Sequence, residues 1–120
     1  MVTRYAAALL TVAGVLALIL GLLFWGGVAL HLGSVHMLLG FLTVAALWVI
    51  ALSQAFAKGG SWILAICAVA VGLLLVILGI EQATLLVGDR HWIIQVIHLL
   101  LGILAIGLGH MAAARSRSRG

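Results

Sequence analysis

Two histidines lie in matching apolar hexads and are the residues that most directly suggest chemistry. Residues 35–40 read VHMLLG and residues 97–102 read IHLLLG, which places His36 and His98 in the same local frame. Ionisable side chains are costly inside apolar helices and usually mark a function there. Neutral imidazole binds transition metals well, and two imidazoles can hold one metal ion from opposite sides. The two hexads therefore indicate a metal-binding pair.

A glycine follows each of these histidines after four residues, at Gly40 and Gly102. Residues four apart share a face of a helix, so each glycine lies beside its histidine on the same face. A flat ring lying against that face would collide with any larger side chain. We expect a porphyrin held by His36 and His98, with Gly40 and Gly102 forming its floor.

The elements that must position this pair are membrane helices. The chain of 120 residues is 67% hydrophobic and 7% charged, and it contains no proline. An average soluble domain is roughly 45–50% apolar and 25% charged, and a short soluble chain cannot bury so much apolar surface. This composition excludes a soluble globular domain, a disordered chain and a nucleic-acid-binding module. The absence of proline removes the commonest cause of sharp helix kinks.

Four apolar runs are long enough to cross a bilayer, which takes about 20 residues. Their continuous hydrophobicity favours helices, since only helices or closed barrels span lipid. Short connections force neighbouring helices to be antiparallel. We therefore predict an all-α, up-down-up-down four-helix transmembrane bundle forming a single domain over residues 1–120. The predicted spans are 5–29, 33–56, 61–81 and 91–113, followed by a basic cytoplasmic tail at 114–120.

The two halves of the chain are similar to each other. Residues 7–23 match residues 65–81 with an offset of 58, and the histidine hexads match with an offset of 62. The rarer letters carry this match, because leucines coincide easily by chance. We predict two repeated helical hairpins related by an axis along the membrane normal. The matched pairs are Gly14 with Gly72, Gly21 with Gly79, His36 with His98 and Gly40 with Gly102.

This symmetry sets the distance between the two histidines. It places the second helix opposite the fourth, and diagonal helices of a square bundle are about 11–14 Å apart. That spacing suits two imidazoles with one metal between them, and a macrocycle would fill the rest of the gap. The four glycines of the first and third helices have two interpretations, close helix packing or contact with the edge of a cofactor.

Lysine and arginine predict the orientation of the bundle. Five of these residues fall on one side and only Arg90 falls on the other. Because cytoplasmic loops carry the excess of positive charge, both termini should be cytoplasmic in a plasma (inner) membrane, with the basic tail touching anionic lipid. The five residues are Arg4, Lys58, Arg115, Arg117 and Arg119.

Polar residues at the outer end have several interpretations. Arg90 could pair with a haem propionate, and His31 or His91 could pass protons or bind a quinol headgroup. Ordinary solvated loop polarity explains the same residues equally well. His110 corresponds to Trp48 under the repeat, so a second, inner haem is not predicted.

We therefore predict a membrane protein with one haem b in the outer half of the bundle. Two histidine ligands leave no open position for oxygen and favour electron transfer over oxygen chemistry, so an electron carrier is favoured over a stand-alone enzyme. Its partners would be the lipid bilayer and either a quinol or a subunit of a redox complex, and a homo-oligomer is compatible with the sequence. The alternatives are polar packing without a cofactor, a pigment, a quinone or a bare metal ion. A cofactor-free accessory or assembly subunit of a larger membrane complex is the alternative of a different class.

The hexads and the four spans together resemble the small four-helix membrane cytochromes b. The likeness is to the cytochrome b561 type and to one half of a haem A synthase. It implies haem b held between helix histidines and electron exchange with quinols or partner redox subunits. The chain departs from both families. A cytochrome b561 usually binds two haems, and Glu81 and Asp89 alone do not reproduce the acidic cluster of a haem A synthase.

Overall fold

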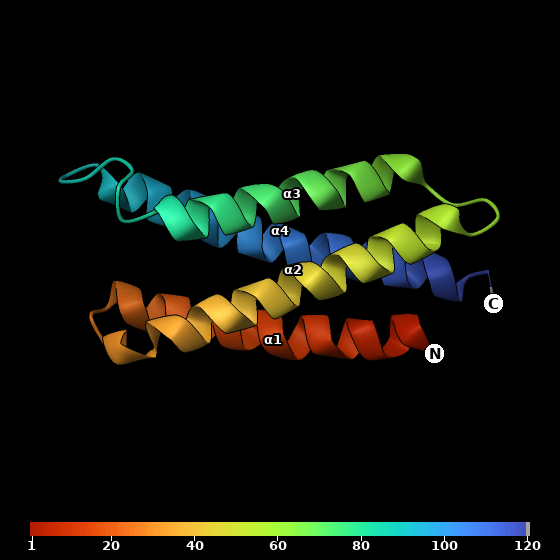
Figure 1. Ribbon diagram of the computed structural model, residues 1–120, viewed down its shortest axis with the longest axis horizontal. Coiled ribbons are helices and arrows are strands. Elements are labelled where there is room, and N and C mark those ends of the chain that lie inside the picture. The colour runs from red at the N-terminus through yellow and green to blue at the C-terminus, as the bar shows by residue number, and fades with distance from the viewer. Residues whose placement is uncertain (120) are drawn as a thin grey trace.

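The computed structural model describes residues 1–119, which form four long helices and one short helical turn (Figure 1). Each long helix is long and apolar enough to cross a membrane, and no strand occurs in residues 1–119. The fold is thus the all-α four-helix membrane bundle that the composition predicts. The elements are α1 (Val2–Trp25), the 3-10 turn η1 (Leu30–Leu32), α2 (Gly33–Phe56), α3 (Trp62–Glu81) and α4 (His91–Arg117).

The two hairpin connections lie at one end of the bundle, which we call the hairpin end (Figure 1). Residues 26–32 join α1 to α2 there, and residues 82–90 join α3 to α4. The opposite end, which we call the terminal end, carries residues 57–61 with the start of α1 and the end of α4. This arrangement is the predicted up-down-up-down order.

Three helix boundaries differ from the predicted spans by three residues or more. The first helix begins at Val2 rather than at residue 5. The first helix ends at Trp25 rather than near residue 29, because the chain turns at Gly27, whose φ is +76°. The residues after this turn are still apolar, so hydropathy does not reveal it. The fourth helix continues beyond residue 113 to Arg117, and its last-turn arginines suit the negative end of the helix dipole. The predicted tail is therefore helical up to Arg117, and residue 120 lies outside the described residues.

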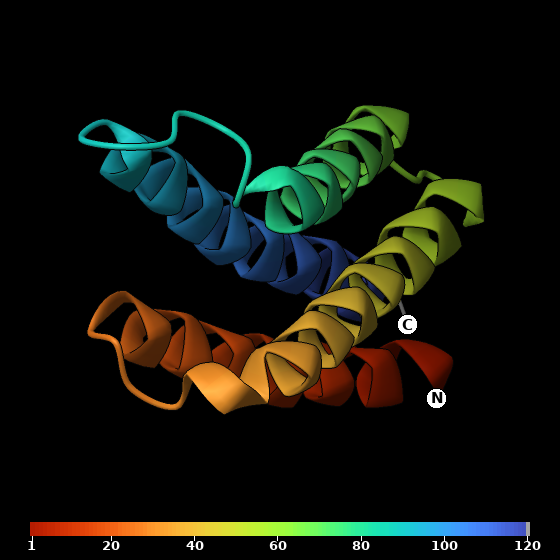
Figure 2. The same ribbon diagram turned by 60° about the vertical axis from the view of Figure 1, so that its left-hand side comes forward.

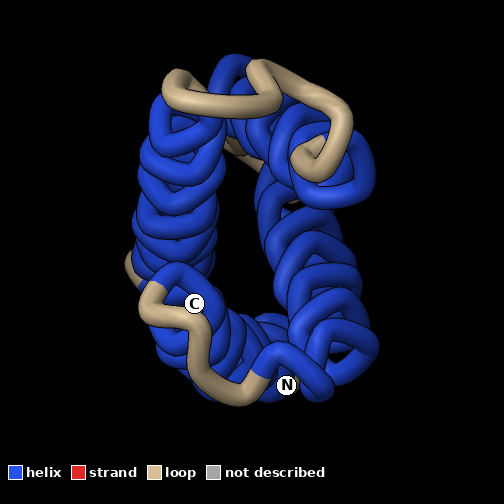
Figure 3. The backbone as a smooth tube through the Cα atoms, turned by 90° about the vertical axis from the view of Figure 1, so that its left-hand side faces the viewer, coloured by secondary structure: helices blue, strands red, loops and turns tan. Residues whose placement is uncertain are grey.

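The bundle is flattened rather than square. Helices α1 and α3 each pack against both α2 and α4, and α2 also contacts α4, whereas α1 and α3 do not meet within residues 1–119. Seen along its long axis, the backbone forms an elongated ring (Figure 3). The expected diagonal gap between the second and fourth helices is therefore wrong where these helices approach. Small side chains allow that approach, and the buried alanines of α2 and α4 are Ala46, Ala51, Ala55, Ala105, Ala112 and Ala113.

The hydrophobic core occupies the half of the bundle nearer the terminal end. Helix α2 runs from beside α1 at the hairpin end to beside α3 at the terminal end (Figure 2), and its buried residues begin only at Thr43. Leu10, Leu47 and Ile50 are fully buried in this half. In the hairpin half, Ile94 is the one buried core residue of α4. The hairpin half is therefore loosely packed.

Candidate functional site

The structure brings His36 and His98 together in the hairpin half. Their ring centroids are 6.3 Å apart, and the ring planes are inclined by 60°. His36 belongs to α2 and His98 to α4, and the two residues are separated by 62 positions in the sequence. The edge of Phe24 also packs on His36, with centroids 5.3 Å apart. The pair predicted from the hexads is therefore a pair in space.

A cavity of about 420 Å³ surrounds these two rings, and all four helices line it. Its volume falls within the roughly 300–1,000 Å³ that is usual for ligand and cofactor sites. Its walls are mostly apolar, as expected inside a membrane bundle. The residues that matter below are Gly21, His36, Gly40, Gly79, His98 and Gly102.

The two repeats contribute to the site in the same way. A Cβ atom added to Gly21 would lie 3.3 Å from Cε1 of His36, and one added to Gly79 would lie 3.1 Å from Cε1 of His98. Each histidine thus lies against the matched glycine of the preceding helix of its own hairpin. This equivalence confirms the two repeated hairpins. It also favours contact with the site over helix packing for Gly21 and Gly79.

The matched glycines closer to the middle of the bundle serve packing instead. A Cβ on Gly14 would lie 2.8 Å from Cδ1 of Ile106, and one on Gly72 would lie 2.9 Å from Cγ1 of Val44. Val44 and Ile106 are themselves related by the offset of 62 between the second and fourth helices. Close helix packing is therefore the correct interpretation for Gly14 and Gly72, whereas contact of Gly21 and Gly79 with a cofactor edge stays a prediction.

The predicted floor glycines border open space. A Cβ added to Gly40 would meet no atom within 4 Å, and one added to Gly102 would make only an ordinary contact with Leu18 at 3.6 Å. Both glycines line the cavity. Helix packing therefore does not explain why these positions lack a side chain, whereas a flat group lying on them would.

The Nδ1 atoms of both histidines are buried and have no hydrogen-bond partner among residues 1–119. The backbone carbonyl of Ala17 is near the ring of His36 but does not form a hydrogen bond to its Nδ1 atom. Buried polar atoms in native proteins are normally paired, so an unpaired one calls for an explanation such as a bound ion. Two such atoms at matched positions fit a pair of rings that serve as ligands.

Polar side chains enter the cavity near the hairpin end. Gln82, His91 and Gln95 line it, and Nδ1 of His91 lies 3.1 Å from the carbonyl oxygen of Leu85. Arg90 precedes α4 as its N-cap and is exposed; it is not part of the cavity lining. The predicted pairing of Arg90 with a propionate therefore stays a prediction.

His110 lies away from this site, on the surface between α1 and α4. Its Nε2 atom is 3.1 Å from Oγ1 of Thr11. The matched residue Trp48 of α2 also makes a hydrogen bond to the other hairpin. Its Nε1 atom donates to the carbonyl of Ala68 in α3 over 3.3 Å. These two residues connect the hairpins at equivalent positions.

Sequence reasoning missed two residues that the structure makes important. Phe24 packs on His36, but an aromatic residue in an apolar run carries no distinguishing signal. Gln54 is only 1% exposed and closes the α2–α3 connection through hydrogen bonds with Ser61. Gln54 could have been identified from the sequence, because it is a polar glutamine within a predicted membrane span.

Among residues 1–119, no group of three or more His, Cys, Asp and Glu side chains is arranged to hold a metal ion. A porphyrin metal needs only the two axial ligands, because the macrocycle supplies the others. Comparisons of the chain with protein-family models, curated protein sequences and solved structures gave no match, so the interpretation of the site depends on its own geometry.

Proposed function

We propose that this chain is a membrane electron carrier with one haem b held by His36 and His98. The separation of the two rings carries the proposal. Nitrogen–metal bonds are about 2.0–2.1 Å long, so one metal can bind both imidazoles only where the two rings lie close together. The 6.3 Å between the ring centroids supports this arrangement.

The residues of the cavity give each part of the site a role. Haem supplies reversible one-electron chemistry when bound. His36 and His98 would occupy both axial positions, which leaves no open position for oxygen. Gly40 and Gly102 would leave the ring faces clear, and the apolar walls would limit the access of water. Electrons would pass to or from a membrane quinol or a partner redox subunit.

The polar end of the cavity supports one orientation of such a group. Gln82, His91 and Gln95 line this end and are the side chains able to bind polar substituents. Arg90 adjoins His91 and is the nearest cationic residue in the sequence. We propose that the carboxylates of the haem face these residues, where they would have hydrogen-bond donors and access to water.

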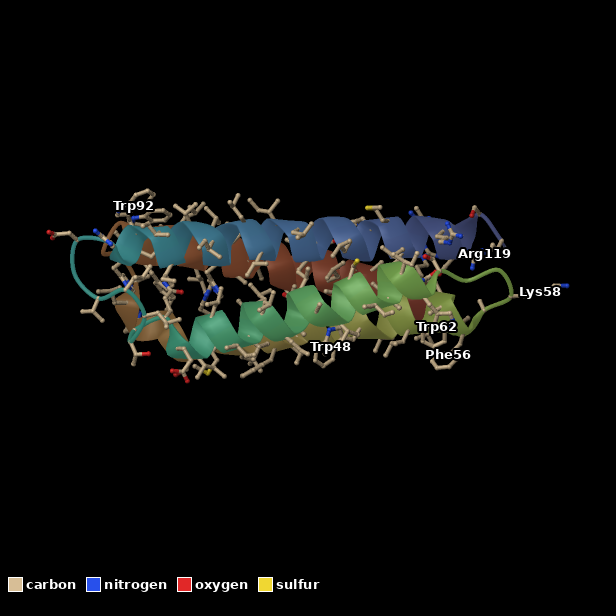
Figure 4. The ribbon with its side chains drawn as sticks, turned by 90° about the horizontal axis from the view of Figure 1, so that it is seen from above. Trp48, Phe56, Lys58, Trp62, Trp92 and Arg119 are labelled. Carbon is tan, nitrogen blue, oxygen red and sulfur yellow. The ribbon has the colours of Figure 1, made fainter. Side chains whose placement is uncertain are left out.

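Charge supports a cytoplasmic location for both termini. Lys58 and Arg119 lie at one end of the bundle, together with Trp62, and Trp92 lies at the other (Figure 4). Tryptophans at both ends suit the two membrane interfaces, and the positive end is the cytoplasmic one in a plasma membrane. The haem would then lie in the outer half. A fluorescent-protein fusion at the C-terminus should fluoresce, and a periplasmic phosphatase fusion there should be inactive.

An absorbance spectrum tests the haem directly. Protein purified from haem-replete cells should show a Soret band and sharp reduced α and β bands, with one haem per chain. His36→Ala and His98→Ala should each abolish the bis-histidine spectrum, because one axial ligand is lost. His110→Ala is the matched control and should leave the spectrum unchanged. A colourless wild-type protein that co-purifies with a larger complex would overturn the proposal and favour the accessory subunit.

A further inference from the structure

The groove between α1 and α4 carries a line of polar residues that the proposed haem site does not use. Thr11 and His110 form a hydrogen bond across it, 3.1 Å long, and His110 is exposed. Residues seven apart lie on nearly the same face of a helix. Arg4 precedes Thr11 by seven positions, and Arg117 follows His110 by seven. The two arginines therefore face the same groove, about 10 Å nearer the terminal end.

These arginines border a hollow at the mouth of the groove. Its volume is about 460 Å³, and Thr3 and Ser116 also line it. The remaining lining residues are Met1 and Ala7. The Ser116 hydroxyl already donates to the carbonyl of Ala112, so the donors expected around a phosphate are chiefly the two guanidinium groups.

No acidic side chain neutralises the positive charge of this hollow. The only acidic residues of the sequence, Glu81 and Asp89, lie at the hairpin end. Arg115 and Arg119 donate hydrogen bonds to the carbonyls of Gly59 and Gln54, at 3.5 and 3.4 Å. Arg4 and Arg117 have no such bond to any residue between 1 and 119. Within residues 1–119 nothing supplies their counter-charge, and an anion from another molecule can provide it.

The repeat relates the α1–α4 groove to the groove between α2 and α3. This second groove has no corresponding pair of arginines. There the positions of Arg4 and Arg117 are taken by Trp62 and Ala55, under the offsets of 58 and 62. Residues 57–61 connect α2 and α3 at this place, and Ser61 is bound to Gln54. The basic hollow is therefore a feature of the α1–α4 groove and is not imposed by the fold.

We propose that Arg4 and Arg117 bind the phosphate of an anionic phospholipid, whose glycerol region extends along the groove toward Thr11 and His110. Basic pockets between transmembrane helices commonly bind lipid headgroups in this way. The surroundings favour a lipid over a free anion. Leu9 and Met111 are exposed on neighbouring turns, 42% and 61% respectively, and can lie against acyl chains. A free phosphate would not use the deeper polar pair.

Lipid binding to the purified full chain tests this site. The chain is delipidated in neutral detergent and titrated with phosphatidylglycerol, with binding followed by native mass spectrometry. Arg4→Gln/Arg117→Gln should weaken binding about tenfold to thirtyfold, since it removes the two guanidinium groups that contact the phosphate in this proposal, each contributing about 1 kcal/mol. Arg115→Gln/Arg119→Gln is the matched control, because it removes the same charge at the same end. It should weaken binding by less than about threefold.

Additional ligands and a lysine variant distinguish the proposed lipid site from a simple anion site. Phosphatidylcholine should bind more weakly than phosphatidylglycerol, and inorganic phosphate should compete poorly. If the glutamine variant does not fold, Arg4→Lys/Arg117→Lys keeps the charge and should still weaken binding, because lysine cannot form bidentate bonds. Equal losses in the two double variants, or binding of phosphate as strong as that of the lipid, would overturn the proposal. The haem spectrum should be unchanged in all variants, so this site and the haem site can fail independently.

Discussion

Each repeated hairpin contributes to both the terminal half and the hairpin half of this bundle, yet the two halves are packed in opposite ways. In the terminal half, a Cβ on Gly72 would collide with Nε1 of Trp48, and one on Gly109 would collide with Leu10. In the hairpin half, a Cβ on Gly40 would meet nothing within 4 Å. Gly72 and Gly109 therefore bring helices together in the terminal half, whereas Gly40 leaves space in the hairpin half.

This difference explains how the chain can keep a cavity of about 420 Å³. Protein interiors are normally close-packed, with few voids larger than a water molecule. The terminal half contains nearly all of the buried residues and holds the four helices in place. The helices of the hairpin half can then stay apart, so that His36 and His98 line the cavity rather than a packed core.

Placing a larger side chain at a close helix contact in the terminal half should have the largest effect on stability. Gly72→Leu puts a side chain where Trp48 and Val44 already lie, and should lower the free energy of unfolding by about 3 kcal/mol. Unfolding in mixed detergent micelles measures this change. Gly40→Leu is the matched control in the hairpin half and should change stability by less than about 1 kcal/mol. Similar losses at the two positions would show that the halves do not differ in packing.

The buried glutamine of the terminal half gives the next largest effect. Nε2 of Gln54 donates to the carbonyls of Ser61 and Ala51, at 2.8 and 3.0 Å, and Oε1 accepts from the Ser61 amide at 3.1 Å. Gln54→Leu leaves the Ser61 amide unpaired and removes two further hydrogen bonds, so it should cost about 1–2 kcal/mol, measured as a lower Tm in detergent. Gln95→Leu removes a cavity-lining glutamine that makes no hydrogen bond with residues 1–119, and should leave Tm nearly unchanged. A larger decrease in Tm for Gln95→Leu than for Gln54→Leu would contradict this prediction.

The smallest effect on stability should have the opposite sign. Gly40→Ala adds a methyl group without a collision, and alanine favours helix over glycine by about 0.5–1 kcal/mol. The apoprotein should therefore become slightly more stable. The haem content of the purified protein should fall, because the methyl group occupies the proposed floor of the porphyrin. Gly102→Ala should behave in the same way. Higher stability with an unchanged ratio of haem to protein would contradict the floor role of these glycines.

Local properties of the chain made the fold predictable. Hydropathy located four helices, and the offsets of 58 and 62 located the repeat, because rare residues such as histidine and glycine stand out among leucines. The end of α1 at Trp25 was not predictable in this way. It depends on a turn at Gly27, and the residues around that turn are as apolar as the helix itself.

The candidate site was predictable only in its central residues. His36 and His98 could be paired by their matching frames, and Gly40 and Gly102 by their spacing from them. The contact of Phe24 with His36 could not be predicted, because nothing distinguishes this aromatic residue from other apolar residues of the span.

A four-helix membrane bundle with repeated hairpins and a matched histidine pair can be predicted from the sequence alone. These features follow from composition and periodicity, which can be read along the chain. The contrast between a closed and an open half, and the basic hollow at the α1–α4 groove, are visible only once the chain is folded. These features depend on how α2 crosses from α1 to α3 and meets α4. That crossing is set by side-chain contacts between segments far apart in the sequence.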